Sequence, residues 1–131
     1  MPQRENIINS YHYTAENAVT QFAVVVEGTD DGEVDMPGGA DVGAIVGVAQ
    51  HAAAAGERVN VAEPGSFTRA IASAAIARGA NVSITGTNGK VKTAAPSSGA
   101  NTFIVGQAKS AAAADGDQIF IFINPSVMQG A

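Results

Sequence analysis

Hydrophobic and polar positions follow the same pattern twice along the chain. Residues 45–61 read IVGVAQHAAAAGERVNV, and residues 104–121 read IVGQAKSAAAADGDQIFI, with one extra residue, Asp115. Each copy starts with an apolar run, continues through four alanines and a glycine followed by an acid, and ends with apolar residues at alternate positions. Such alternation is typical of a half-buried β-strand. Each copy is therefore predicted to be a strand, a bend and a second strand.

The alanine runs raise the question of helices. Alanine has the highest helix propensity, but each run is too short to stand as a helix and a glycine follows closely, so a single turn or tight bend is predicted. Residues 71–78 allow two interpretations. One is a two-turn helix with Gly79 at its C-cap, and the other is a strand, a bend and a turn that ends at Gly79.

Further strands are predicted where short apolar runs are separated by Gly, Pro and Asn. Residues 21–26 and 33–36 flank a glycine-containing turn, and residues 81–84 and 90–93 flank a turn that contains Asn-Gly, a strong hairpin signal. Residues 44–49 are apolar on both faces, which predicts a buried strand.

The end of the chain adds one more strand. Residues 118–123 are apolar throughout, so both faces of this strand are expected to be covered, and Pro125 is predicted to end it. About nine short strands result. They predict an all-β fold, a small β-sandwich or barrel with an internal duplicated strand-bend-strand unit and at most one short helix.

Residues 1–20 differ from the rest of the chain. They are polar and show no sustained period, which predicts an extended N-terminal arm that ends in a turn. Ile7, Ile8, Tyr11 and Tyr13 make this arm too apolar for a solvated tail, so we expect it to dock on another surface. Residues 21–131 are expected to form a single β domain that contains one internal duplication.

Composition limits the core and the chemistry. The chain has 131 residues, of which 46% are hydrophobic, but much of this fraction is alanine and only 5% of residues are aromatic. A thin core of this kind favours oligomerisation. The chain has no cysteine, which excludes disulfides and thiolate metal sites. It also lacks the long apolar run of a signal peptide or membrane span, so we expect a protein that is soluble where it is made and binds no membrane.

Charge is distributed unevenly. The net charge is −5, and residues 1–68 hold ten acidic against two basic residues, whereas residues 69–131 hold two acidic against five basic residues. The acidic excess argues against binding to a nucleic-acid backbone. The separation of charge would suit copies that pack head to tail, although a solvated acidic face is the more ordinary explanation.

No motif for catalysis or cofactor binding is present. His12 and His51 lack the spaced partners of a metal site, no serine lies in a GxSxG context, and the glycines form no phosphate-binding motif. The acidic residues around Gly32 lack the spacing of a calcium loop and fit an exposed hairpin tip. We therefore expect no enzyme, no cofactor and no metal.

The repeat resembles the capsid decoration, or cement, proteins of tailed bacteriophages. The resemblance covers about residues 20–123 and is carried by IVGVA, the alanine bend with glycine and acid, and VNV in the first copy, then IARGANV, GKV, IVGQA and AAADGD. It implies a non-enzymatic structural virion protein that binds the outer surface of the assembled capsid and stabilises it. It further implies the major capsid protein as partner, a homo-oligomer that is often a trimer, and synthesis in the cytoplasm of a bacterial host.

Two questions stay open at this level. The arm, through Arg4, Ile7, Ile8, Tyr11 and Tyr13, either lies on the shell or a neighbouring copy, or covers its own barrel. As an alternative function, the chain is a host-surface or carbohydrate-binding β domain displayed on the virion. That class normally exposes aromatic side chains, and Tyr11 and Tyr13 are the only tyrosines. A small β-barrel enzyme is the third possibility.

Overall fold

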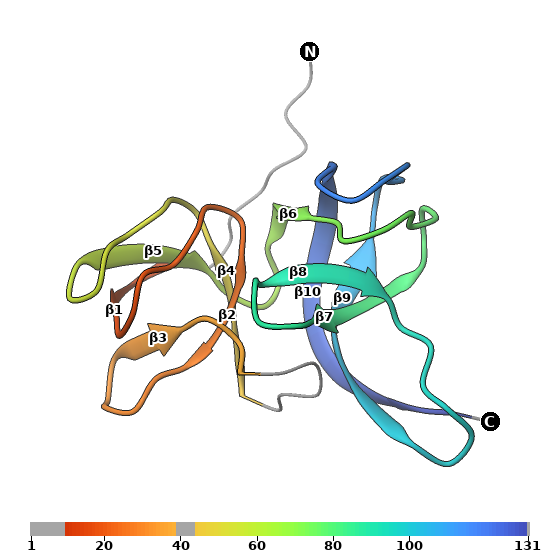
Figure 1. Cartoon of the computed structure of the whole chain (residues 1–131), viewed down its shortest axis with the longest axis horizontal. Helices are drawn as coiled ribbons and strands as arrows, with labels where there is room; N and C mark the ends of the chain where they lie inside the picture. Colours follow the sequence, from red (N-terminus) through yellow and green to blue (C-terminus); the bar gives the residue numbers. More distant parts are fainter. Residues whose placement is uncertain (1–9, 39–43, 131) are drawn as a thin grey trace.

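The computed structural model describes residues 10–38 and 44–130, and its fold is all-β (Figure 1). Ten strands form two five-stranded units that lie side by side. The first module, residues 10–62, is a closed barrel of β1 (Ser10–Ala15), β2 (Val24–Glu27), β3 (Glu33–Asp35), β4 (Ile45–Ala49) and β5 (Arg58–Ala62). The second module, residues 67–130, is a sheet of β6 (Phe67–Ile71), β7 (Asn81–Thr85), β8 (Lys90–Thr93), β9 (Asn101–Ala108) and β10 (Gln118–Gln129). The predicted β-barrel or sandwich class is confirmed.

The two modules have the same strand connections. In the barrel the neighbours run β1, β5, β4, β2, β3, and in the sheet they run β6, β10, β9, β7, β8. The barrel closes where β3 pairs in parallel with β1, and a parallel bridge between Ala72 and Val91 joins the end of β6 to β8 in the same way. Each strand of the second module therefore corresponds to the strand five places earlier. The duplication extends over all five strands, beyond the two that the sequence pattern predicted.

The alanine runs form bends, as predicted. Ala53 exchanges backbone hydrogen bonds of 2.9 and 3.1 Å with Val19, and Ala112 exchanges bonds of 3.0 and 2.9 Å with Ile76. The methyl side chain lets each bend lie close against the opposing segment. Of the two interpretations for residues 71–78, strand, bend and turn is confirmed, because β6 ends at Ile71 and Ile76 makes the bridge to the second alanine bend.

A glycine in each copy permits a very close backbone contact within its module. A Cβ atom on Gly47 would lie 2.0 Å from the carbonyl oxygen of Ala62, and a Cβ atom on Gly106 would lie 1.9 Å from the carbonyl oxygen of Phe122. Both distances are far below van der Waals contact. The IVG motif that opens both copies therefore needs glycine for steric reasons.

Two hydrophobic cores are present, and the second belongs to both modules. The barrel interior holds side chains such as Val25, Val46 and Val59. The alternate residues of its strands point outward and join the core of the second module, together with Phe22 from the turn before β2: Val24, Val26, Val48 and Ala62. Because β4 contributes to both cores, it is buried on both faces, as its apolar sequence predicted. The shared core holds the modules together.

The prediction that Pro125 ends the last strand is wrong. β10 continues to Gln129, and the register irregularity between Ile123 and Ser126 accommodates the proline before pairing with β9 resumes. The expected cover on both faces of residues 118–123 is only partly present. The isoleucines are fully buried, whereas Phe120 and Phe122 are half-buried on the outer face.

Candidate functional site

The structure describes two of the five predicted contact residues of the arm. Arg4, Ile7 and Ile8 lie outside the described residues. Tyr11 and Tyr13 lie in β1, where they pair with Val61 and Val59 of β5.

Tyr13 contacts its own module. Its side chain is half-buried against the barrel core, and its hydroxyl donates a hydrogen bond of 2.5 Å to Oε2 of Glu63 in the segment between the modules. Residues 10–15, which the sequence pattern assigned to the arm, thus include a strand of the barrel wall. Tyr13 would anchor any segment that precedes it.

The two histidines have different environments. His12 is exposed on β1. Nε2 of His51 accepts a hydrogen bond of 3.2 Å from the backbone N–H of Asn60, so Nδ1 carries the proton and donates to the carbonyl of Ala52 at 3.0 Å. In residues 10–38 and 44–130, no group of three or more His, Asp or Glu side chains is arranged to hold a metal ion.

The acid of each repeat completes a turn. Oε1 of Glu57 accepts a hydrogen bond of 2.7 Å from the backbone N–H of Ala54. In the second copy, Oδ2 of Asp117 accepts bonds of 2.8 and 3.1 Å from the N–H groups of Ala113 and Ala114. The glycines before both acids have φ values of +83° and +92°, which only glycine adopts without strain. The glycine-acid motif is therefore structural.

The acidic residues of β3 also satisfy local backbone groups. Oε1 of Glu33 accepts from the N–H of Asp30 at 3.1 Å, and Oδ1 of Asp35 accepts from the N–H of Met36 at 2.8 Å. Asn17 donates to the other oxygen of Asp35 at 3.1 Å. The turn before β3, residues 30–32, is an exposed hairpin tip, in agreement with the interpretation from sequence.

The end of the sheet carries an apolar surface that the sequence did not indicate. We define the C-terminal ribbon as residues 101–104 of β9 paired with residues 126–129 of β10. Val127 is 57% exposed and Met128 is 37% exposed, and they are the exposed large hydrophobic residues of the described chain. Val127 lies directly opposite Phe103. Val127 and Phe103, together with Ile45 and Pro125, line a hollow of about 210 Å³.

The ribbon is fixed at its tip. The N–H of Gly130 donates to the carbonyl of Ala100 at 2.9 Å, and the N–H of Gly99 donates to the carbonyl of Gly130 at 3.0 Å. Gly130 also lies so close to the backbone of Ser97 that a Cβ atom would meet its oxygen at 1.9 Å. The apolar surface is thus held in place before any partner binds.

A second, polar hollow lies on the outer face of the sheet. It has a volume of about 350 Å³, and its polar lining consists of Asn81, Gln107, Lys109, Asn124 and Ser126. Phe122 borders it and packs against Phe67 with a ring centroid distance of 4.9 Å.

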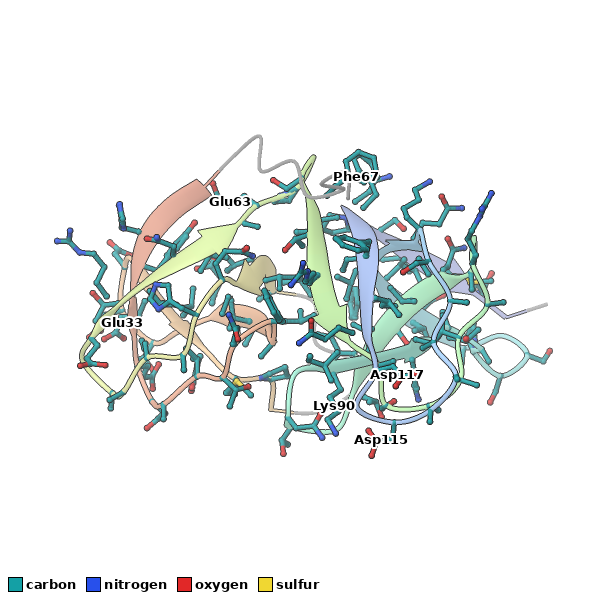
Figure 2. All side chains as sticks on the ribbon, turned by 90° about the horizontal axis from the view of Figure 1, so that it is seen from above. Glu33, Glu63, Phe67, Lys90, Asp115 and Asp117 are labelled. Carbon is teal, nitrogen blue, oxygen red and sulfur yellow. The ribbon has the colours of Figure 1, made fainter. Side chains whose placement is uncertain are left out.

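The two modules differ in charge. The described residues of the first module include seven acidic residues against one base, Arg58, and those of the second include five basic against two acidic residues. Figure 2 shows Glu33 on the first module, and Lys90 next to Asp115 and Asp117 on the second. Lys90 and Asp115 form an exposed ion pair of 2.8 Å. The charge asymmetry of the sequence is therefore an asymmetry between the two ends of the molecule.

No helix in the described part of the chain has the length and hydropathy of a membrane span. The distinctive features of the described surface are an apolar ribbon, a polar sheet face and two modules of opposite charge. Among these features, exposed apolar residues that lie together are typical of a site of contact with another protein.

Comparison with known proteins identifies the class. The chain belongs to the phage cement protein family, which it matches over residues 3–123. Its structure is similar to the crystal structure of the N base of head fiber gp8.5 in bacteriophage phi29, with a TM-score of 0.63 and 20% sequence identity over 88% of this chain and 93% of that chain. No curated protein matches the chain. The resemblance found in the sequence is confirmed, and the protein is a structural protein of a phage virion.

Proposed function

We propose that this protein binds the outer surface of the assembled capsid and stabilises it by holding neighbouring shell subunits together. Membership of the phage cement protein family over residues 3–123 carries this proposal. The partner is the major capsid protein, and the function is non-enzymatic. The protein is made in the cytoplasm of the bacterial host and is added to the outside of the shell.

The core shared by the two modules supports a role in holding shell subunits together. A protein that holds two shell subunits together is effective only if it does not open between its contact points. Here residues of β2 and β4 are buried against the second module. The backbone N–H of Val24 also donates to the carbonyl of Gly89 at 2.9 Å, which links the barrel to the β7–β8 turn. Separation of the modules would expose this apolar surface to water, so the two move as one body.

The charge difference between the modules supports association of copies. An acidic first module and a basic second module attract each other when copies are arranged head to tail, and such heterologous contacts form a ring when the rotation between copies closes. We favour a homotrimer. This attraction is screened by salt, so association in solution is expected to weaken between low and moderate ionic strength.

The arm contributes contacts outside the described fold. In this proposal Arg4, Ile7, Ile8 and Tyr11 lie on the shell or on a neighbouring copy, and Tyr13 fixes the base of the arm to the barrel. The hydrogen bond from Tyr13 to Glu63 supports the anchoring role.

Co-sedimentation with empty capsids from the same phage tests the proposal. The full chain is expected to pellet with the capsids and to raise the temperature at which the shells open. A variant that lacks residues 2–9 keeps β1 and should have the melting temperature of the full chain, but should occupy fewer capsid sites. Failure of the full chain to pellet with capsids at every salt concentration would refute the function. Full occupancy by the shortened chain would refute only the role of the arm.

One observation favours the alternative of host-surface or carbohydrate binding. The polar hollow combines amide side chains with the half-buried ring of Phe122, and such combinations suit neutral hydroxyl-rich ligands. A glycan array with the purified protein separates the two functions. A saturable signal that is lost in an Asn81→Ala, Gln107→Ala double variant would support adhesion, and absence of any signal would leave the cement function alone.

A further inference from the structure

The C-terminal ribbon has a backbone edge that no described residue covers. β6 pairs with β10 only as far as Phe67 opposite Phe122. One residue further on, the carbonyl of Ile123 accepts a hydrogen bond from the N–H of Gly65, and the N–H of Ile123 donates to the carbonyl of Ser66. Beyond this point β10 continues to Gln129 with β9 as its only pairing partner among the described strands. Residues 124–129 are all exposed. This segment is therefore an open sheet edge.

The direction of its backbone groups follows from the register. Gly130 directs its N–H and carbonyl toward residues 99 and 100. Backbone groups alternate in direction along a strand, so Met128 bonds toward β9, whereas the N–H and carbonyl groups of Val127 and Gln129 point to the open side. A strand laid along this edge would find donors and acceptors at regular spacing.

The edge lacks the usual protection against pairing. Soluble proteins guard exposed edges with charged residues, prolines or bulges. Pro125 and the bulge lie before the edge, and residues 118–130 contain no charged residue. Val127 and Met128 are adjacent and so point to opposite faces of the ribbon. The edge therefore offers apolar contact on both faces to an added strand.

The chain contains a segment with the matching pattern. Ile7 and Ile8 are adjacent β-branched residues in the otherwise polar segment QRENIIN. In an extended strand they would point to opposite faces, as Val127 and Met128 do. We propose that residues 4–9 of a neighbouring copy add as a strand to the open edge of β10, with the two isoleucines beside Val127 and Met128. This inference rests on the self-association in the proposed function and assigns its receiving surface.

The apolar hollow supplies a place for one of the two isoleucines. It is lined on the Val127 face of the ribbon by Phe103 and Pro125, and by Ile45 from the first module. An isoleucine in this hollow would remove the exposed surface of Val127 from water. Such burial of apolar surface adds affinity to the main-chain hydrogen bonds of strand addition.

Charge indicates a neighbouring copy as the donor. Ile8 and Ile7 lie two and three residues before Ser10, which pairs with Ala62 in the first module. The ribbon belongs to the second module (Figure 1). The described residues of the first module are mainly acidic and those of the second mainly basic, so head-to-tail packing would bring the arm of one copy to the ribbon of the next. The occupant is therefore assigned to a second copy.

Cysteine cross-linking tests the contact, because the natural chain has no cysteine to interfere. Two single variants, Ile7→Cys and Val127→Cys, are made with tags of different size, mixed, and oxidised both free and on capsids. The expected product is a disulfide-linked heterodimer at about tenfold or more the yield of a matched control. The control pairs Ile7→Cys with Thr87→Cys, which lies at the exposed tip between β7 and β8.

The outcomes separate the inference from the function. Heterodimers at the control yield, both free and on capsids, would overturn the inference. If capsid co-sedimentation persists in that case, the proposed function stands and only the receiving surface is wrong.

A Val127→Lys variant gives a second measure of the contact between copies. It places a charge on a solvent-exposed position, so folding should be unchanged while association between copies weakens. Unchanged association would contradict the strand contact.

Discussion

The backbone N–H of Asn60 donates a hydrogen bond of 3.2 Å to Nε2 of His51. The corresponding bond in the second module runs from the N–H of Phe120 to Oγ of Ser110, at 3.0 Å. A histidine and a serine thus perform one structural task at equivalent positions, which is to connect the alanine bend to the strand that follows it. This equivalence gives His51 a structural task that serine performs in the other module.

Substitution of His51 by alanine should therefore destabilise the protein, because the N–H of Asn60 loses its acceptor at a half-buried site. We expect a loss of about 1 kcal/mol. His51→Ser should recover part of this loss, since serine serves the same position in the second module. Urea denaturation of the three proteins measures the effect, and equal stability of the alanine and serine variants would show that the acceptor is not important.

The glycines that open the two repeat copies should not tolerate any side chain. Gly47→Ala and Gly106→Ala each place a Cβ atom about 2 Å from a carbonyl oxygen, so neighbouring strands must move apart. We expect each to cost about 3 kcal/mol or more, at the upper end of overpacking effects. Gly38→Ala is the matched control, because its Cβ would meet no atom within 4 Å. Thermal melts that show all three variants alike would contradict the steric explanation.

Asp117, the acid of the second repeat copy, should contribute more to the free energy of unfolding than Asp115. Asp117→Ala removes two hydrogen bonds to backbone N–H groups of the bend, for which we expect a loss of about 1–2 kcal/mol. Asp115→Ala removes only the exposed ion pair with Lys90, for which we expect a loss of less than about 0.5 kcal/mol. Chemical denaturation of the two variants compares the effects directly. The reverse order would mean that the bend does not depend on its acid.

Substitutions of Phe22, at the boundary between the modules, should separate the cost of its strained backbone from the stabilisation by its buried ring. Its φ is +62°, the only such value outside glycine in the described residues, and the corresponding residue of the second module is Gly79, with a φ of +91°. Its ring is buried in the shared core and lies 5.9 Å from the guanidinium of Arg69. Phe22→Ala removes the ring but keeps the strain. We expect it to cost about 3 kcal/mol or more, and Phe22→Gly to be about 1 kcal/mol more stable than Phe22→Ala.

The measurement for this pair is the free energy of unfolding in urea. An alanine variant as stable as the glycine variant would show that the backbone at position 22 relaxes when the ring is removed.

Much of the fold is readable from the sequence because strand periodicity and turn chemistry act over short distances. Alternation at Val59 and Val61, the Asn-Gly turn before β8 and the glycine-acid pair of each bend specify local geometry directly. The full extent of the duplication is not readable in this way. Its signal is faint, with Ala15, Ala18 and Val19 corresponding to Ala72, Ala75 and Ile76, and three small residues do not distinguish a repeat from chance in an alanine-rich chain.

The contact surface was harder to predict for a different reason. Nothing in residues 124–129 indicates that the strand resumes after Pro125, because the pairing that stabilises it comes from residues 101–104 and from Gly130 at the tip. The exposure of Val127 likewise depends on where β6 ends. Both are properties of strand neighbours that are distant in the chain.

The sequence by itself determined the β class, the repeated unit and the separation of charge along the chain, since these follow from the order and period of the residues. Tertiary structure alone decided that the outward face of the barrel becomes part of the second core, that His51 serves as a backbone acceptor, and that β10 extends as an apolar ribbon with one open edge. These features require the pairing of strands far apart in the chain, and a local pattern does not specify which strand will be its neighbour.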